Sequence, residues 1–306
     1  MNLVSFQWIV PKEWEGAFLR EFLREDKQIS RKLLKEIKFQ GHLSLNDQSV
    51  TVKSVIKEGD CVCVRLPVEQ VSEVLKPLQY ELDIIYEDKH ILIINKPPYL
   101  PTIPSREDSD YSLANAVVNY YEKQRIPGTF HAVNRLDRNT SGLVLIAKHR
   151  YAHDLFVKQL KHTLQRTYLA VVHGRLTPPS GTVRAPIARK TTSIIERMVS
   201  PDGKDAITHY HTLDASDKAT LVDVQLETGR THQIRVHFHY LGHSLVGDDL
   251  YGGETSKFPR QALHAKRVTF VHPFTSEEMM FEAPISDDMA TLIREQIDDR
   301  SLLNDC

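Results

Sequence analysis

The residue with the clearest potential for chemistry is Asp137, within residues 131–149 (HAVNRLDRNTSGLVLIAKH). It lies between Arg135 and Arg138 and is followed by the turn-forming residues NTSG and by LVLIA, an apolar run typical of a strand. The sequence thus places one carboxylate at a strand edge among cations, and a nearby guanidinium keeps a carboxylate ionised and aims its oxygens. Asp and Asn also hydrogen-bond their own backbone in ordinary turns, so the motif alone leaves both interpretations open.

The motif resembles the signature of the RluA/RluD family of RNA pseudouridine synthases, which is His-Arg-Leu-Asp, two variable residues, then Thr-Ser-Gly. Asn134 stands where that His is usual, and Tyr99 and Ile103 replace a Gly and a His that usually follow the Lys-Pro of an earlier block. Further blocks similar to those of the family occur in the family's order, from about residue 81 to about residue 284. They are EDKHILIINKPP near Asn95, RTYLAVVHG near Tyr168, ETGRTHQIRVH near Arg230, GDDLYGG near Asp248 and ALHAKRVTFVHP near His264.

The resemblance implies an isomerase that converts uridine in RNA to pseudouridine. The bond from ribose C1′ to base N1 breaks, the flipped-out base turns while it stays bound, and C1′ joins C5, so no metal or cofactor is required. Asp137 matches the family's invariant acid and is the predicted catalytic residue, either as nucleophile or as base on the ribose. Tyr168 matches the aromatic residue that stacks on the target base, and Arg230 matches the basic residue that pairs with the acid.

Cationic side chains around this motif are candidates for RNA contacts. Residues 131–175 carry eight Lys or Arg against two Asp, an excess typical of a surface that meets a polyanion. Arg135 and Arg138 could draw the RNA backbone towards the acid, although both could equally form local ion pairs. Asn95 and Lys96 are expected to support the site from its rim.

The N-terminal region has the order of elements found in small RNA-binding S4 domains. The stretch RKLLKEIKF predicts a helix with Ser30 as its N-cap and one apolar face, and residues 41–67 alternate and contain turn residues, as expected for short strands. A charged helix face is most simply a solvated face, but the resemblance to S4 domains implies that it lies on RNA phosphates. The residues to which we assign this role are Arg31, Lys35 and Lys38.

We expect an α+β protein of two domains, because 306 residues exceed the length of one average domain. Residues 1–66 are predicted to form a small S4-like α/β RNA-binding domain, residues 67–79 a linker, and residues 80–285 the pseudouridine synthase catalytic domain. Alternating strands with few intervening helices predict a mainly antiparallel mixed sheet flanked by helices in the catalytic domain. Residues 286–306 are predicted to form an acidic C-terminal helix or tail.

The net charge of −1 is unevenly distributed, because residues 276–306 carry nine acidic and two basic side chains. Cys61, Cys63 and Cys306 are too few for a disulfide framework or a four-cysteine zinc site, which fits a reducing compartment. No signal peptide or apolar run of the roughly 20 residues that span a bilayer is evident. We therefore expect a soluble, cytoplasmic monomer that binds structured RNA, with ribosomal RNA favoured over transfer RNA, and neither a membrane nor a metal.

Two alternatives come from other parts of the chain. His232, His239 and His243 are spaced seven and four apart and could share one helix face with Asp248 beyond, as in a metallohydrolase, although no HExxH motif is present. The chain could also be a non-catalytic RNA-binding protein, in which Asp137 would be dispensable. A glycosidase is disfavoured, since it would use two cooperating carboxylates and the active block offers one.

Overall fold

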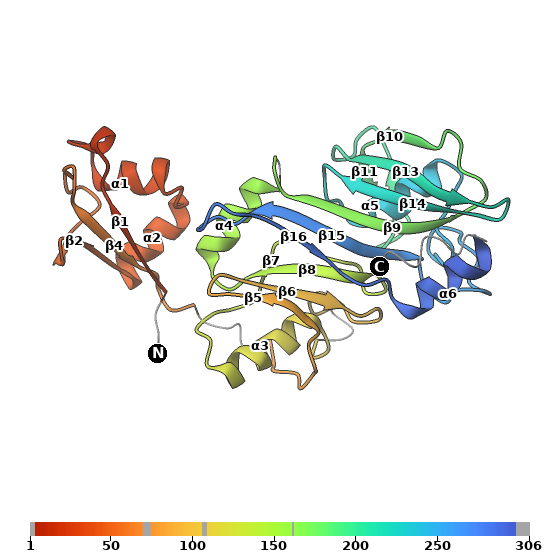
Figure 1. The fold of residues 1–306 in the computed structure, drawn as a ribbon, viewed down its shortest axis with the longest axis horizontal. Coiled ribbons are helices and arrows are strands. Elements are labelled where there is room, and N and C mark those ends of the chain that lie inside the picture. Colours follow the sequence, from red (N-terminus) through yellow and green to blue (C-terminus); the bar gives the residue numbers. More distant parts are fainter. Residues whose placement is uncertain (1–3, 70–74, 106–108, 161, 298–306) are drawn as a thin grey trace.

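The computed structural model describes residues 4–69, 75–105, 109–160 and 162–297. It contains a four-stranded sheet near the N-terminus, a ten-stranded sheet that organises most of the remaining chain, and a small two-stranded sheet (Figure 1). The predicted linker and C-terminal tail include residues 70–74 and 298–306, which lie outside the described residues. Within the described ranges, no helix is long and apolar enough to cross a bilayer.

The N-terminal unit packs helix α2 (Arg31–Gln40) against an antiparallel sheet of order β1-β4-β2-β3. Ser30 caps this helix as predicted, because its Oγ accepts a hydrogen bond from the N–H of Leu33 at 3.2 Å. The predicted apolar face of the helix is buried, whereas the stretch GAFLREFLRED, which also has helical spacing, contains only a short α-helix and a π-helix. The remaining elements are β1 (Ser5–Ile9), a 3-10 helix (Lys12–Trp14), α1 (Leu19–Glu21), the π-helix (Phe22–Asp26), β2 (His42–Leu45), β3 (Gln48–Ser49) and β4 (Cys61–Arg65).

The larger sheet has the order β10-β13-β14-β9-β15-β8-β6-β5, with β16 beside β15 and β7 beside β8. Strands β15 and β8 run parallel and the other described pairs run antiparallel, which confirms the expected α+β class and mixed sheet. Strands β5 and β6 form a hairpin, and Asp88 at its turn accepts hydrogen bonds from two backbone N–H groups. The strands are β5 (Ile84–Glu87), β6 (Ile91–Lys96), β7 (His131–Ala132), β8 (Ser141–Ala147), β9 (Gln165–His173), β10 (Ser180–Arg184), β13 (Ile207–Ala215), β14 (Ala219–Leu226), β15 (Leu263–Val271) and β16 (Glu278–Glu282), and the small sheet pairs β11 (Ile187–Arg189) with β12 (Arg197–Val199).

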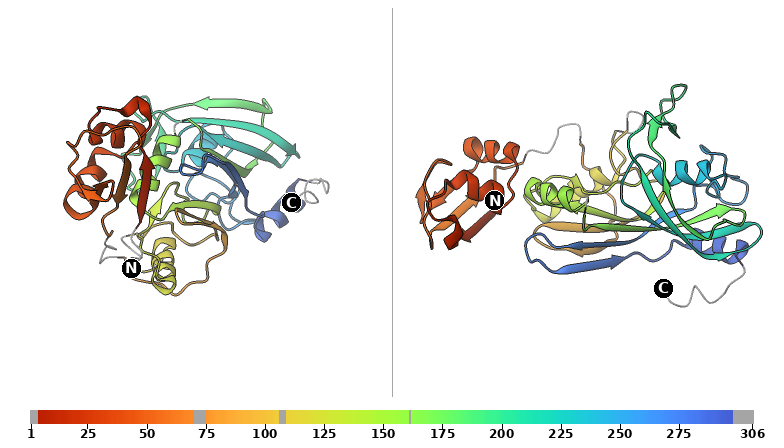
Figure 2. Two further views of the ribbon diagram at one scale, coloured as in Figure 1. Left: turned by 60° about the vertical axis from the view of Figure 1, so that its left-hand side comes forward. Right: turned by 90° about the horizontal axis from the view of Figure 1, so that it is seen from above.

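Helices cover both faces of the larger sheet, and its central strands are therefore buried on both sides (Figure 2). On β9, the side chain of Tyr168 packs with residues of α3 and α5, whereas the adjacent Leu169 points to the opposite face and packs with α6. The two faces therefore have separate cores, and the site described below lies on the Tyr168 face. The helices are α3 (Leu113–Gln124), α4 (Arg150–Gln159), α5 (Gln233–Tyr240) and α6 (Asp287–Gln296).

The N-terminal unit contacts the larger sheet region through α4 and a group of aromatic rings. The hydroxyl of Tyr151 donates to the carbonyl oxygen of Lys27 at 2.5 Å. Phe6 of β1 stacks on Phe274, with ring centroids 5.3 Å apart, and His90 stacks on Phe274 at 4.0 Å. Burial lowers the pKa of His90 to about 4, so its ring is neutral at physiological pH and packs as an apolar aromatic group.

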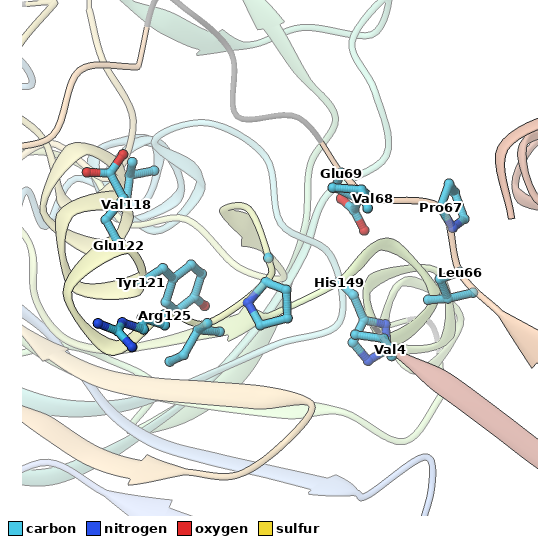
Figure 3. Close-up of a pocket in the computed structure, with 13 residues that line it drawn as sticks. Val4, Leu66, Pro67, Val68, Glu69, Val118, Tyr121, Glu122, Arg125 and His149 are labelled. Atoms are coloured by element: carbon cyan, nitrogen blue, oxygen red, sulfur yellow. The ribbon is translucent and has the colours of Figure 1, made fainter. Parts of the chain in front are cut away.

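A cavity of about 450 Å³ lies beside this junction (Figure 3). Its lining is mainly apolar and comes largely from the end of helix α3 and from the segment that follows β4, and it includes the charged or polar residues Glu69, Glu122, Arg125 and His149. None of its lining residues belongs to the loop that carries Asp137, so this cavity is separate from the site described next.

Candidate active site

Asp137 lies in the loop between β7 and β8, and hydrogen bonds hold this loop on both sides of it. The hydroxyl of Thr102 accepts from the N–H of Leu136 at 3.1 Å and donates to the carbonyl oxygen of Leu136 at 2.7 Å. The N–H of Thr140 donates to the carbonyl oxygen of Asp137 at 3.1 Å, which closes the predicted turn. Gly142 has φ +105°, and a Cβ there would collide with the backbone of β15, so only glycine allows β8 and β15 to meet behind this loop.

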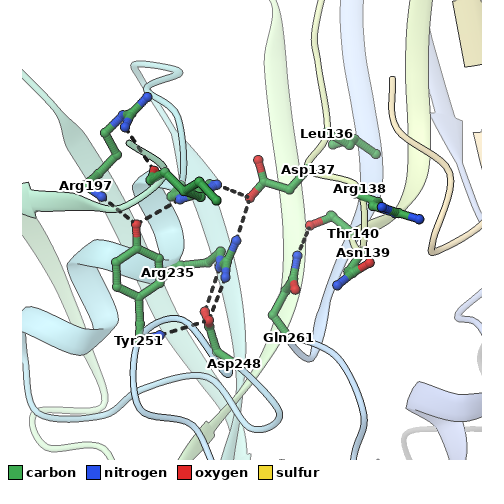
Figure 4. Close-up of polar contacts among 12 residues, drawn as sticks. Leu136, Asp137, Arg138, Asn139, Thr140, Arg197, Arg235, Asp248, Tyr251 and Gln261 are labelled. Atoms are coloured by element: carbon green, nitrogen blue, oxygen red, sulfur yellow. Dashed lines mark hydrogen bonds and ion pairs between the residues drawn. The ribbon is translucent and has the colours of Figure 1, made fainter. Parts of the chain in front are cut away.

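The carboxylate of Asp137 faces a guanidinium that is itself held in place. Nη1 of Arg235 lies 3.4 Å from Oδ2 of Asp137, while its Nε and Nη2 donate to the two oxygens of Asp248 at 2.7 Å each (Figure 4). Asp248 is fully buried, and a bidentate pair of this kind restricts the orientation of the guanidinium. The ring of Tyr251 adds a cation–π contact at 5.0 Å. The Asp137 side chain remains 26% exposed, so a substrate can reach it.

The structure corrects the predicted partner of the acid, because Arg235 occupies the place assigned to Arg230. Arg230 is exposed, and its Nε donates to the carbonyl oxygen of Asp205 at 2.8 Å. It precedes α5, whereas Arg235 lies in the first turn of that helix and reaches the catalytic loop. Both arginines belong to the block ETGRTHQIRVH, whose pattern alone does not distinguish them. The signal that could have done so is Asp248 in GDDLYGG, since a buried carboxylate requires a cation beside it.

Tyr168 reaches the same site from β9, and its side chain is only 5% exposed. Burial raises the pKa of its hydroxyl, Arg166 opposes this shift, and the negative charge of Asp137 adds to it. Asp137 and Tyr168 therefore lie within electrostatic range of each other, and the hydroxyl stays protonated at neutral pH. Of the three residues predicted to be catalytic, Asp137 and Tyr168 thus interact electrostatically, whereas the guanidinium that meets Asp137 is that of Arg235 and not that of Arg230.

Lys96 does not lie at the rim of the site as predicted, because it is fully buried beneath the catalytic loop. Its ammonium donates to three backbone carbonyl oxygens, so it has no donor left for an RNA phosphate. Asn95 is half-buried on β6, and its amide donates to the carboxylate of Asp83 at 2.9 Å. Both residues therefore have structural roles, and the predicted position of Lys96 at the rim, where it could meet RNA, is wrong.

The other cations assigned to RNA are on the surface. Arg135 and Arg138 are exposed on either side of Asp137, and Nε of Arg138 lies 3.4 Å from the carbonyl oxygen of Tyr99. Tyr99 and Ile103, which depart from the family pattern, are 45% and 42% exposed, so the loop beside Asp137 presents two apolar side chains to solvent. Helix α2 has four exposed cations, which are the predicted Arg31, Lys35 and Lys38 together with Lys32.

Asn134, the third departure from the family pattern, has a structural role in this chain. It is buried, and its amide donates to the carbonyl oxygen of Leu143 at 3.1 Å and accepts from the N–H of Leu145 at 2.8 Å. An amide can make both bonds at once, which ties the start of the catalytic loop to strand β8.

The histidines considered as metal ligands do not share a helix face. His232 precedes α5 in a left-handed conformation with φ 57°, and its Nε2 lies 3.9 Å from Oδ2 of Asp137. His239 lies near the end of α5, where its Nδ1 is 3.1 Å from Oγ of Ser244, and His243 follows the helix. Within the ranges that the structure describes, no group of three metal-ligating side chains is present. The geometry on which the metallohydrolase alternative depends is therefore not found.

Comparisons with known proteins identify the family of this chain. Residues 90–240 match the family model described as RNA pseudouridylate synthase, and residues 6–62 match the RluD ribosomal pseudouridine synthase N-terminal domain. RNA pseudouridine synthase YjbO of Bacillus subtilis is 53% identical over 268 residues, which cover 87% of this chain and 95% of YjbO. Ribosomal large subunit pseudouridine synthase D of Escherichia coli K12 is 38% identical over 79% of this chain and 78% of its own length.

A solved structure is similar as well. Human RNA pseudouridylate synthase domain containing 1 superposes with a TM-score of 0.55 at 25% identity, over 71% of this chain and 86% of the human chain. The chain therefore belongs to the family of RNA pseudouridine synthases, which are isomerases. The resemblance noted in the sequence is thereby confirmed.

Proposed function

We propose that this chain isomerises specific uridines in ribosomal RNA of the large subunit, with Asp137 as its catalytic residue. The observation that carries the mechanism is the arrangement of one accessible carboxylate against the Arg235 guanidinium, which Asp248 holds in place. Relatives named ribosomal large subunit pseudouridine synthase D support the choice of RNA, at 36–38% identity. Transfer RNA is the second candidate substrate.

In the proposed reaction, a flipped-out uridine places its ribose against Asp137. Asp137 either attacks the ribose carbon or removes a ribose proton, and the C1′–N1 bond breaks. Tyr168 then holds the detached base by stacking until C5 joins C1′, which releases Asp137 from the ribose or returns the ribose proton. C5 loses its proton and N1 gains one, so the reaction has no net redox change. Arg235 orients the Asp137 oxygen and offsets its negative charge, and Arg135 and Arg138 approach the RNA backbone on either side.

The proposed substrate is tested by mapping pseudouridine in ribosomal and transfer RNA from cells that lack this protein. We expect specific positions of the large ribosomal RNA to lose pseudouridine and to regain it when the wild-type chain is restored. Loss confined to transfer RNA would favour the second candidate, and an unchanged map would contradict the proposed activity.

We also propose that the N-terminal unit is an S4-like domain whose helix α2 lies on RNA phosphates. Two observations support this: residues 6–62 match the N-terminal domain model of RluD, and the α2 cations Arg31, Lys35 and Lys38 are exposed. Its contacts would position the RNA without reading its sequence. The cytoplasmic, monomeric state expected from the sequence stays a prediction.

The α2 assignment predicts a change in salt dependence. The double replacement of Lys35 and Lys38 by Ala should weaken binding to a large-subunit rRNA transcript and to an unrelated transcript equally. Each lost phosphate contact should lower the slope of log affinity against log salt by about 0.7–0.9. Filter binding at several salt concentrations measures this, with Lys57→Ala, an exposed lysine outside α2, as the control. A slope unchanged by the double replacement would show that α2 is only a solvated face.

A further inference from the structure

The segment 96–102 holds the catalytic loop on both sides of Asp137. On one side, the Thr102 hydroxyl bonds both the N–H and the carbonyl oxygen of Leu136. On the other side, Nζ of Lys96 donates to the carbonyl oxygen of Arg138 at 3.2 Å. The peptide groups before and after Asp137 are thus anchored to one short segment, and these anchors determine where the carboxylate lies relative to Arg235.

Lys96 makes its contact in an unusual state for a lysine, with 0% of its surface exposed and no carboxylate partner among the described residues. Nζ also donates to the carbonyl oxygens of Pro97 and Leu100, each at 2.8 Å. An ammonium has three N–H donors and no acceptor, so three carbonyl oxygens satisfy it completely. A neutral amine has two donors and would turn a lone pair towards the third oxygen. The Arg138 contact is the longest of the three, so it is the one most easily lost.

We propose that Lys96 is a positioning residue for the reaction, and that only its ammonium form holds the Arg138 carbonyl and thereby places Asp137 against Arg235. The inference rests on the proposed role of Asp137 as the catalytic carboxylate. It assigns a function to a cation that cannot touch the RNA itself.

A second buried cation, Arg260, anchors the next peptide of the loop. Its Nη1 donates to the carbonyl oxygen of Asn139 at 2.9 Å, and its Nε donates to Asp288 at 2.7 Å. A guanidinium stays charged throughout the physiological pH range. His264 of β15 lies beside this group, and burial lowers its pKa to about 4, so it is neutral at physiological pH.

The pKa of Lys96, in contrast, is lowered to about 7. Burial is the main cause, the positive charge of Arg260 adds to the lowering, and the negative charge of Asp137 opposes it. Other charged side chains near the loop are Arg135 and Arg138 within it, Arg235 beside Asp137, and Asp288, which pairs with Arg260. Catalysis that depends on the ammonium should therefore decline as the pH rises through about 7. Folding responds in the opposite direction. The unfolded lysine holds its proton up to its ordinary pKa of 10.5, so this group makes the fold more stable as the pH rises from about 7 to that value.

The test compares single-turnover rates between about pH 6 and 9 for wild type, Lys96→Met and Lys89→Met. Lys89 is an exposed lysine in the β5–β6 turn and provides a matched control. The reaction is followed by tritium release from a large-subunit rRNA transcript labelled at uridine C5. We expect the wild-type and Lys89→Met rates to fall above about pH 7, without a loss of thermal stability. The single-turnover rate of Lys96→Met should be at least about tenfold lower than that of wild type at pH 6, and it should not fall further as the pH rises to about 9. The RNA affinity of this variant should be unchanged.

A direct titration keeps the proposal testable if Lys96→Met does not fold. In wild type with ¹³C-labelled lysine, the Lys96 ε-carbon resonance, assigned by its absence in Lys96→Arg, should titrate with the alkaline limb of the rate. An NMR titration midpoint near 10 would overturn the proposed role of Lys96, and so would a pH–rate profile of Lys96→Met that superimposes on that of wild type. Either result would leave the proposed function of the protein intact. If the wild-type chain makes no pseudouridine in any RNA, the proposed function fails, and the role of Lys96 fails with it.

Discussion

Replacing Asp137 by Asn should abolish pseudouridine formation while leaving RNA binding and folding intact. The amide has almost the same shape but carries no negative charge, so it can neither attack ribose nor remove a proton from it. Because the Asp137 side chain is 26% exposed, the replacement leaves no buried charge unpaired. We expect the single-turnover rate to fall by a factor on the order of 10³–10⁴, measured by tritium release from labelled rRNA, with RNA affinity measured separately.

Asp249→Asn is the matched control for this experiment. Asp249 is exposed, belongs to the same GDDLYGG block as Asp248, and makes no hydrogen bond or ion pair within the described part of the chain. Its replacement should leave the rate unchanged. Full conversion of uridine by Asp137→Asn would refute the assignment of the acid. If wild type converts uridine and Asp137→Asn binds the RNA without converting it, the protein is not merely an RNA-binding protein.

Arg235 should be far more important than Arg230, the residue that the sequence motif suggested. Arg235→Met leaves Asp248 fully buried without its cation, which should destabilise the fold by about 3–5 kcal/mol. Arg230→Met removes one exposed contact to a backbone oxygen and should cost no more than about 1 kcal/mol. Urea unfolding of the two variants measures this difference.

Arg235→Lys separates catalysis from stability, because the variant keeps the positive charge beside Asp248. An ammonium cannot reproduce the planar guanidinium, which bonds both oxygens of Asp248 and faces Asp137 at the same time. We expect it to fold and to lose activity by a factor on the order of 10². Arg230→Lys is the control and should retain its rate. If the Arg230 variants lost activity and the Arg235 variants did not, the pairing described here would not be the catalytic one.

Local patterns were sufficient wherever neighbouring residues carry the information. The capping of α2 by Ser30 and the turn that follows Asp137 were both predicted correctly. In each case, side-chain spacing and turn chemistry act within a few residues of one another. The stretch GAFLREFLRED shows the limit of such patterns, because it has helical spacing but forms a π-helix that buries Phe22 and Leu23 while departing from α-helical hydrogen bonding.

Lys96 shows why burial was harder to predict. Strand β6 is buried on both faces, so alternation along the strand does not indicate which side chains reach solvent. A lysine at its end is normally expected at the surface. Its burial becomes evident only when the carbonyl oxygens of the 97–100 segment and of the catalytic loop converge on one point.

The sequence by itself determined the family and the class of reaction, and it predicted Asp137 as the acid, because these inferences depend on residue types in short ordered blocks. Only the tertiary structure decided which arginine meets Asp137, since that contact joins residues 98 positions apart and depends on the left-handed turn at His232 and on buried Asp248. It likewise decided that Lys96 lies inside the protein. The physical reason is the same in both cases: a buried charge is placed by the groups that neutralise or solvate it, and here those groups come from distant parts of the chain.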